Sequence, residues 1–204
     1  MNNPLTEFSP EILVRTRKLS CERDHRLLFF GVDLELKQQE LVELRGPNGC
    51  GKTTLLRCLA GLSHDYRGSI ERAVKPLYIG HKGGLNPLLT PRENLTWYQS
   101  LQSGAPIGGQ NIPGALERIG LAGYEDVPCQ YMSAGQQRRT VLARLVLSPA
   151  PIWLLDEPLT ALDSAGTALV RDLISQHAST GGCAVYATHQ SLKLPQSTTL
   201  MLGS

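Results

Sequence analysis

Gly46-Pro-Asn-Gly-Cys-Gly-Lys-Thr-Thr54 fits the pattern G-x-x-x-x-G-K-[ST], which is typical of loops that bind phosphate. Its glycines let the backbone curl until successive N–H groups point inward at phosphate oxygens. Lys52 would bring a positive charge to the β- and γ-phosphates of a nucleotide, and the Thr53 hydroxyl is placed to ligate Mg²⁺. We predict phosphate contacts from the whole loop, which comprises Gly46, Pro47, Asn48, Gly49, Cys50, Gly51, Lys52, Thr53 and Thr54.

The residues on either side of this loop have the pattern that the motif requires. Glu40–Arg45 alternates like a short strand with Leu41 or Val42 inward, and Thr54–Ala60 is apolar at helical spacing and closed by Gly61. A helix that begins at the loop adds the positive end of its dipole to the phosphate site. By itself the loop predicts binding of a nucleoside triphosphate and leaves open what the energy is used for.

The composition of the chain is that of an ordinary globular protein. The 204 residues are 41% hydrophobic and 19% charged, enough for one domain or a core with a lobe. A net charge of +2 is too small to predict a nucleic-acid partner, and we interpret the basic run Arg15–Lys18 as a solvated strand edge. No apolar stretch is long enough for a membrane span, and Glu7 and Pro10 interrupt any signal-peptide pattern, so we expect no membrane anchor.

The cysteines predict neither a zinc site nor a disulfide framework. Their number is odd and no C-x-x-C pair occurs, which favours a reducing cytosol. One of them, Cys50, lies inside the phosphate loop. The sequence leaves two interpretations of it open, a small filler residue or a thiol whose modification would block nucleotide binding. The five are Cys21, Cys50, Cys58, Cys129 and Cys183.

Strand and helix patterns alternate along the chain. Helical patterns cover residues 91–98, 114–119, 133–147 and 165–177, and the first begins with Thr90 as a cap before Pro91. The alternation predicts an α/β fold with a largely parallel core sheet. Apolar runs that favour strands cover residues 11–17, 27–36, 74–79, 152–156, 184–188 and 198–202.

Residues 83–130 differ in character from the sequence on either side. They are rich in glycine and proline yet contain two of the helical patterns. Gly104–Gly109 within them is interpreted as a flexible loop. We interpret the region as a helical lobe inserted in the core.

Ile152-Trp-Leu-Leu-Asp-Glu-Pro158 places two acids directly after an apolar run. The run is typical of a strand buried on both faces of a parallel sheet, and open α/β sheets bind ligands at the carboxyl ends of their strands. Asp156 is therefore a candidate ligand of Mg²⁺, directly or through water, and Glu157 a candidate general base for the attacking water. The plainer interpretation is a pair of acids in a turn before Pro158, and the phosphate loop upstream favours the functional one.

Tyr131-Met-Ser-Ala-Gly-Gln-Gln-Arg-Arg139 is a candidate second anion site. Ser133 stands where an N-cap would stand, and the small residues Ala134 and Gly135 leave backbone N–H groups open to a ligand. Two anion sites in one small domain suggest a nucleotide shared between two copies of the chain. A simple capping turn would also explain this stretch by itself.

Taken in order, these motifs resemble the ATP-binding-cassette ATPases from about Leu27 to His189. The resemblance implies a P-loop NTPase core with a mainly parallel sheet, an N-terminal antiparallel β part and an inserted helical subdomain. It divides the single domain 1–204 into a core of about 1–82 and 134–204 and a helical lobe of about 83–133. The matching stretches after the loop are Tyr131–Gln137, Leu154–Pro158, Leu159-Thr-Ala-Leu-Asp163 and Ala187-Thr-His-Gln190.

The resemblance also implies roles for single residues. Asp163 matches the D-loop, and His189 matches the switch histidine that contacts the γ-phosphate. ATP and Mg²⁺ are the implied ligands, and a homodimer that forms on ATP binding is the implied assembly. The family signature reads Leu-Ser-Gly-Gly-Gln; here Met132 and Ala134 replace its first and third residues. The signature residues that would contact the nucleotide of a second copy are Ser133, Ala134, Gly135 and Gln136.

Two other positions depart from the family pattern. A glutamine, the Q-loop residue, is expected about nine residues before Thr90, where this chain has His81. The aromatic residue that stacks on adenine is missing, and the equivalent stretch is Cys21–Arg26. Within it, Arg23 offers a planar guanidinium group that could stack on the base.

A narrower resemblance is to the ATP-binding subunit of the haem exporter of bacterial cytochrome c maturation. Members of that group are similar to this chain at the position of His81, so His81 is not a departure from the pattern of that group. The resemblance implies an integral membrane transporter partner, a peripheral position on the cytoplasmic side of the bacterial inner membrane, and coupling of ATP hydrolysis to haem export or to release of a haem-loaded chaperone. It rests on Cys21–Asp24, Ile79–His81, Leu121–Asp126, Met132–Arg139 and Thr188–Gln190.

Three alternatives stay open at this point. An ATPase subunit of an ABC transporter for another small solute would share every motif except the turns around His81 and Ala134. A soluble cassette ATPase of DNA repair or translation would need long insertions or tandem cassettes, for which 204 residues leave no room. A small-molecule kinase would use the phosphate loop but would not need the signature stretch.

Overall fold

The computed structural model describes residues 12–103 and 111–203. Within these residues the N-terminal strands form an antiparallel sheet, in which β1 (Ile12–Arg23) lies between β2 (Arg26–Lys37) and β4 (Arg67–Arg72). This arrangement confirms the two predicted N-terminal strands, which are longer than expected, and adds β4, which was not predicted. Because β1 is the central strand, our interpretation of Arg15–Lys18 as a sheet edge is wrong. The Arg15 side chain is buried and its Nε donates to Glu35 at 2.9 Å.

The second sheet is parallel throughout, which confirms the predicted α/β fold. Its strand order is β5-β6-β7-β3-β8. Leu41 to Leu44 are all buried, so the prediction of one inward face for this segment is wrong: the strand lies inside the sheet and is covered on both sides. Val74 to Pro76 lie outside the strand that was predicted to include them. The strands are β3 (Leu41–Arg45), β5 (Leu77–Ile79), β6 (Ile152–Asp156), β7 (Cys183–Ala187) and β8 (Ser197–Met201).

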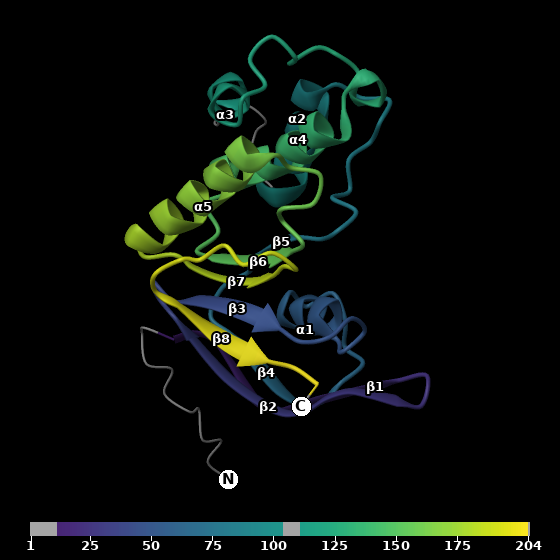
Figure 1. The fold of residues 1–204 in the computed structure, drawn as a ribbon, viewed down its shortest axis with the longest axis vertical. Helices are drawn as coiled ribbons and strands as arrows, with labels where there is room; N and C mark the ends of the chain where they lie inside the picture. Colours follow the sequence, from purple (N-terminus) through teal and green to yellow (C-terminus); the bar gives the residue numbers. More distant parts are fainter. Residues whose placement is uncertain (1–11, 104–110, 204) are drawn as a thin grey trace.

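Different elements cover the two faces of the parallel sheet. On one face α1 (Lys52–Leu59) and the antiparallel sheet share a core with Val42, Leu154 and Val185. On the other face α4 (Ala134–Leu147) and α5 (Ser164–Ser179) pack on residues such as Trp153 and Tyr186. Figure 1 shows α5 above β6 and β7, α1 beside β3, and the antiparallel sheet at the lower end of the molecule. Successive side chains of a strand point to opposite faces of the sheet, so each fully buried strand contributes residues to the apolar clusters on both faces.

A third cluster of apolar residues joins α2 (Pro91–Ser103), α3 (Ile112–Arg118) and the short 3₁₀ helix η1 (Cys129–Tyr131) to α4. These helices lie at the upper end of the molecule in Figure 1. Helix α2 begins as predicted: the Thr90 hydroxyl accepts from Glu93 N at 3.2 Å, and the Glu93 carboxylate accepts from Thr90 N at 2.8 Å. The predicted loop Gly104–Gly109 lies outside the described residues.

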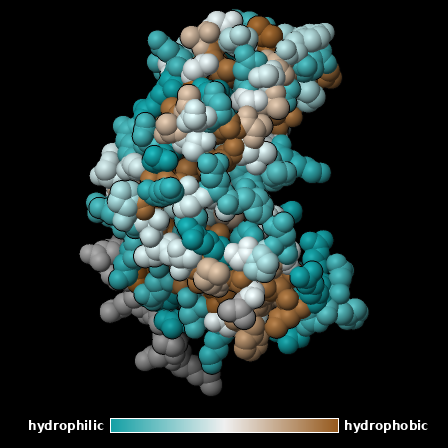
Figure 2. Space-filling view, viewed as in Figure 1, coloured by the Kyte–Doolittle hydropathy of each residue, from teal (hydrophilic) through white to brown (hydrophobic). Residues whose placement is uncertain are grey.

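The surface of the molecule is hollowed on one side. In the space-filling view the outline is indented between the helical end above and the β1–β2 hairpin below (Figure 2). Asp24 and His25 form the hairpin turn with positive φ angles of 50° and 59°, as two-residue turns between twisted strands require. Across the part of the chain that the structure describes, no helix has both the length and the apolar character needed to span a membrane.

Candidate functional site

A hollow of about 580 Å³ collects most of the predicted site residues from distant parts of the chain. The loop between β3 and α1 forms one wall, and the carboxyl ends of β5, β6 and β7 supply His81, Asp156, Glu157 and His189. From the loop, the lining residues are Asn48, Gly49, Gly51, Lys52, Thr53 and Thr54. The strand order brings these segments together because the carboxyl ends of parallel strands meet at one edge of a sheet.

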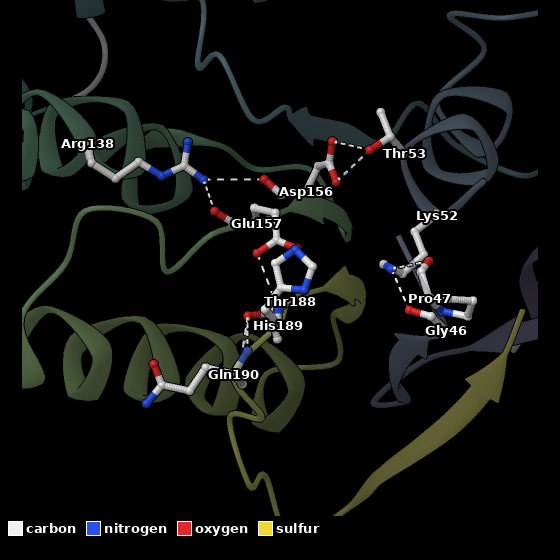
Figure 3. A network of polar contacts seen from close by, with 10 residues as sticks. All are labelled: Gly46, Pro47, Lys52, Thr53, Arg138, Asp156, Glu157, Thr188, His189 and Gln190. Carbon is white, nitrogen blue, oxygen red and sulfur yellow. Dashed lines mark hydrogen bonds and ion pairs between the residues drawn. The ribbon is translucent and has the colours of Figure 1, made fainter. Parts of the chain in front are cut away.

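The loop between β3 and α1 has the geometry of a phosphate cradle. Gly46, Gly49 and Gly51 all have positive φ angles, of 145°, 78° and 99°. Gly51 is the cap before α1, so the free N–H groups of the first helical turn face the hollow. Lys52 folds back over the loop, and its Nζ donates to the carbonyl oxygens of Gly46 at 2.7 Å and Pro47 at 3.1 Å (Figure 3).

The Cys50 side chain points away from this hollow into the protein. It is 6% exposed and belongs to the apolar cluster under the antiparallel sheet. The segment after β8 packs directly on it, since a Cβ atom added at Gly203 would lie 3.0 Å from Cys50 Cβ. Burial favours the interpretation of Cys50 as a filler residue and not as an accessible thiol.

Thr53 and Asp156 meet at the floor of the hollow although they are far apart in the sequence. The Thr53 hydroxyl donates to the two carboxylate oxygens of Asp156, at 2.9 and 3.1 Å (Figure 3). Asp156 is buried at the end of β6, and the nearby Tyr78 has its pKa raised to about 12 by burial first and by the Asp156 charge second. A hydroxyl and a carboxylate in contact are the hard oxygen ligands that Mg²⁺ takes in proteins, so these two residues fit that ion.

Glu157 and His189 face each other across the mouth of the hollow. The backbone of Glu157 is left-handed, with φ of 50°, and its N–H donates to Ala187 O at 2.8 Å. One carboxylate oxygen lies 3.4 Å from His189 Nε2, and the other accepts from His189 N at 3.4 Å (Figure 3). The Glu157 side chain is mostly buried while that of His189 is 66% exposed, so the histidine is the outer member of the pair.

The third motif lies on a different surface. Ser133 begins α4 in a capping box: its hydroxyl accepts from Gln136 N at 3.2 Å, and the Gln136 side chain accepts from Ser133 N at 2.9 Å. Asp163 caps α5 by accepting from Gly166 N at 2.7 Å, a bond that lowers the pKa of Asp163, with Arg139 as a further cause. A hollow of about 640 Å³ contains Gly120, Tyr124, Ser133, Gly135, Gln136, Arg139, Ala161, Leu162 and Asp163.

Comparison with known proteins agrees with this geometry. The profile of the ABC transporter family matches residues 29–160. A curated relative from Pseudomonas syringae, "Cytochrome c biogenesis ATP-binding export protein CcmA", is 46% identical over 94% of this chain and 93% of its own length. The chain belongs to the ABC transporter family. It is an ATPase of the ABC type.

Further relatives of this ABC ATPase have the same name. They include proteins of Saccharophagus degradans, 45% identical over 88% of both chains, and of Yersinia pestis, 44% identical over 88% of this chain and 87% of theirs. Two solved structures have the same fold. One is an ATP-binding subunit of an ABC transporter, with a TM-score of 0.80, 20% identity and coverage of 93% and 85%. The other is an ATP-binding cassette in its ADP conformation, with a TM-score of 0.73, 15% identity and coverage of 95% and 90%.

The ABC ATPase site also contains residues that sequence reasoning missed. Arg23, the residue suggested for base stacking, lines the hollow together with its neighbour Asp24, and the pairing of β1 with β2 adds Leu28, which was not predicted. Arg138 is buried behind Asp156 and Glu157. A signal for it existed: Arg138 stands three and four residues before the core residues Val141 and Leu142, so it is a charge on the apolar face of α4.

Proposed function

We propose that this chain is the ATP-hydrolysing subunit of a membrane ABC transporter complex for cytochrome c biogenesis. It would couple ATP binding and hydrolysis to a membrane partner that exports or delivers haem or releases a haem-loaded chaperone. The names of relatives that are 44–47% identical over most of the chain support this assignment. The alternative is the ATPase subunit of an ABC transporter for another small solute.

The observation on which the ATPase chemistry rests is the meeting of the phosphate loop, Asp156, Glu157 and His189 in one hollow. Lys52 would exchange its carbonyl partners for the β- and γ-phosphate oxygens, which bind an ammonium group more strongly because they are charged. The loop residues Gly46 to Thr54 would bind the phosphates through their N–H groups and the dipole of α1.

Thr53 and Asp156 would hold Mg²⁺, because their oxygens already converge within hydrogen-bond distance of each other. The ion would neutralise negative charge on the phosphates. Glu157 would act as general base, taking a proton from the attacking water, and His189 would contact the γ-phosphate. His81, which matches the Q-loop position, lines the same hollow.

The signature residues would act on the nucleotide of a second copy. Ser133, Ala134, Gly135 and Gln136, with Asp163 of the D-loop, belong to another surface than the phosphate loop, so a homodimer would complete each site. ATP would favour the closed dimer because only there does it contact both motifs. Closure would move the helical lobe, about 83–133, against the core, about 1–82 and 134–204, and so act on the membrane partner.

The chain would therefore lie peripherally on the cytoplasmic side of the bacterial inner membrane. Its partners would be integral membrane transporter subunits, and it would have no nucleic-acid partner. The net charge of +2 offers no general attraction for nucleic acid.

Two experiments test the proposal. Glu157→Gln should keep ATP affinity, lower turnover by about 10²- to 10⁴-fold and accumulate an ATP-bound dimer, because it removes only the base. Unchanged turnover would show that Glu157 is not the base.

For the biological role, the tagged chain extracted in detergent should copurify with an integral membrane subunit and a haem-handling chaperone. Recovery with DNA or ribosomes would refute the assignment, and recovery with a solute importer would favour the alternative.

A further inference from the structure

Arg138 on α4 is buried with its guanidinium group surrounded by backbone carbonyl oxygens. It is 7% exposed. Its Nη2 donates to Glu157 O at 2.7 Å and to Asp156 O at 3.4 Å (Figure 3). Its Nε donates to Pro158 O at 3.3 Å, and its Nη1 donates to Gly80 O at 3.3 Å. The planar guanidinium group of one side chain therefore contacts the last residue of β6, the two residues that follow it, and the residue before the Q-loop position.

Such a buried cation is costly unless its donors are satisfied, and here carbonyl dipoles satisfy them. Burial lowers the pKa of Arg138, while the charges of Asp156 and Glu157 act in the opposite direction. An aliphatic side chain would suit the apolar face of α4, where Val141 and Leu142 follow at helical spacing. The arginine therefore points to a requirement other than packing.

The segment that Arg138 contacts is held in an unfavourable conformation. Glu157 has a φ of 50°, a left-handed backbone that non-glycine residues rarely adopt and that persists only when its surroundings hold it. Three hydrogen bonds do so: Glu157 N donates to Ala187 O at 2.8 Å, and Glu157 O accepts from Arg138 at 2.7 Å and from Thr160 N at 3.3 Å. With the backbone held on both sides, the Glu157 carboxylate faces His189 and the hollow.

A second arginine on the same helix binds the far part of the turn that follows β5. Arg144 donates to Gly83 O at 2.7 Å and to Gly84 O at 3.1 Å, and its guanidinium carbon lies 4.8 Å from the centre of the Tyr98 ring. Gly80 and Gly83–Gly84, on the two sides of His81, are thus both attached to α4.

We propose that Arg138 is a positioning residue for ATP hydrolysis: it holds the turn after β6 so that Glu157 points at the attacking water, and it ties this turn and the His81 turn to α4. The inference rests on the proposed role of Glu157 as general base. Because Ser133 caps α4, a movement of this helix when the signature engages a nucleotide would shift Glu157 and His81 together. The plainer interpretation is that Arg138 only stabilises the core.

Kinetics of substituted proteins separate the two interpretations. The full chain, isolated with its membrane subunits, would carry Arg138→Met or Arg138→Lys. A misplaced base should lower kcat by about 10- to 100-fold. ATP affinity, measured by calorimetry, should stay within about threefold because the phosphate loop is untouched. Arg138→Lys keeps the buried charge but lacks the fork, so it should fold and still lose turnover.

Arg72→Met is the matched control. Arg72 is also a partly buried arginine that donates to carbonyl oxygens, those of Cys58 and of Leu59, the latter at 2.7 Å, but these lie at the end of α1 that is remote from the phosphate loop. It should lower the unfolding temperature and leave kcat within about twofold, as expected of a residue that acts on stability alone. If Arg138→Lys behaves like Arg72→Met, Arg138 is structural and the proposal is wrong.

A double-mutant cycle identifies the residue through which Arg138 acts. In the Glu157→Gln background, Arg138→Lys should lower the residual single-turnover rate by less than about twofold, because residues that act as a unit are strongly non-additive. A further tenfold loss in that background would overturn the proposal. If Glu157→Gln itself leaves turnover unchanged, the assignment of Glu157 as the base is wrong. If Glu157→Gln lowers turnover but the Arg138 substitutions leave it unchanged, only the positioning role of Arg138 is wrong.

Discussion

Gly46→Ala should destabilise this protein much more than Gly49→Ala, although both glycines lie in the phosphate loop at positive φ. At Gly46 a new Cβ would overlap the carbonyl oxygen of Leu202 and lie 3.2 Å from Leu202 C and 2.8 Å from Cys50 Sγ. At Gly49 the nearest atom would be the end of the flexible Arg26 side chain, at 3.5 Å. The comparison separates the cost of the backbone conformation from the cost of the close approach.

The structure supplies the magnitude of each effect. A left-handed backbone at a non-glycine residue costs about 1–2 kcal/mol, and Gly49→Ala should lose about this much. At Gly46 the φ of 145° lies farther from the left-handed well, so the strain is at least as large, and overpacking adds about 1–3 kcal/mol. Leu202 cannot move away freely, because its N–H donates to Arg45 O at 2.8 Å. Breaking that bond would cost about 1 kcal/mol more, so Gly46→Ala should lose about 3–6 kcal/mol in total.

Thermal unfolding without nucleotide measures the difference. For a chain of this length each kcal/mol lowers the midpoint by about 2–4 °C, so Gly46→Ala should unfold roughly 10 °C below the unsubstituted protein and Gly49→Ala a few degrees below it. Leaving out ATP matters, because ligand binding would add its own stabilisation to the folded state. Equal midpoints for the two variants would refute the packing of the segment after β8 against the loop.

Three further predictions concern other side chains. Lys52→Ala should weaken ATP binding by about tenfold or more through loss of charge-assisted hydrogen bonds, and normal affinity by calorimetry would contradict the phosphate role. The buried Cys50 thiol should resist a maleimide reagent in the folded protein and react after denaturation; fast labelling of native protein, located by mass spectrometry, would contradict its burial. Burial lowers the pKa of His177, which stacks on Trp153, so the unfolded state binds the proton more readily below pH 6.5. Stability should therefore fall as the pH drops from about 6.5 towards 5, and less so in His177→Gln; identical urea midpoints against pH in both proteins would exclude the effect.

Short-range features were predictable from the sequence because their partners are close along the chain. The phosphate loop places N–H groups, Lys52 and Thr53 within a few residues, and the caps at Thr90 and Ser133 involve side chains three residues apart. The apolar run before Asp156 indicated a strand covered on both faces, and β6 is buried throughout. In each case local backbone geometry sets the contacts, whatever the rest of the fold does.

Errors arose where burial depends on what covers a segment. Glu43 made Leu41–Arg45 look like an amphipathic strand, yet its carboxylate is buried and accepts from Arg45 at 3.1 Å and Ser191 at 3.3 Å. Strand β4 (Arg67–Arg72) lacks an apolar alternation because it is an edge strand with much exposed surface. Strands that contain a buried ion pair or lie at a sheet edge lack the hydrophobic pattern from which strands are predicted.

The local sequence is therefore sufficient for the phosphate loop, the main helices and the acids at the end of β6. The contacts that make a site of them depend on the non-sequential strand order β5-β6-β7-β3-β8. Only that order brings Thr53 to Asp156 across 103 positions of the chain and lays Leu202 against the loop. Such long-range pairs follow from how the sheet is assembled and how the helices cover it, which no local pattern of residues records.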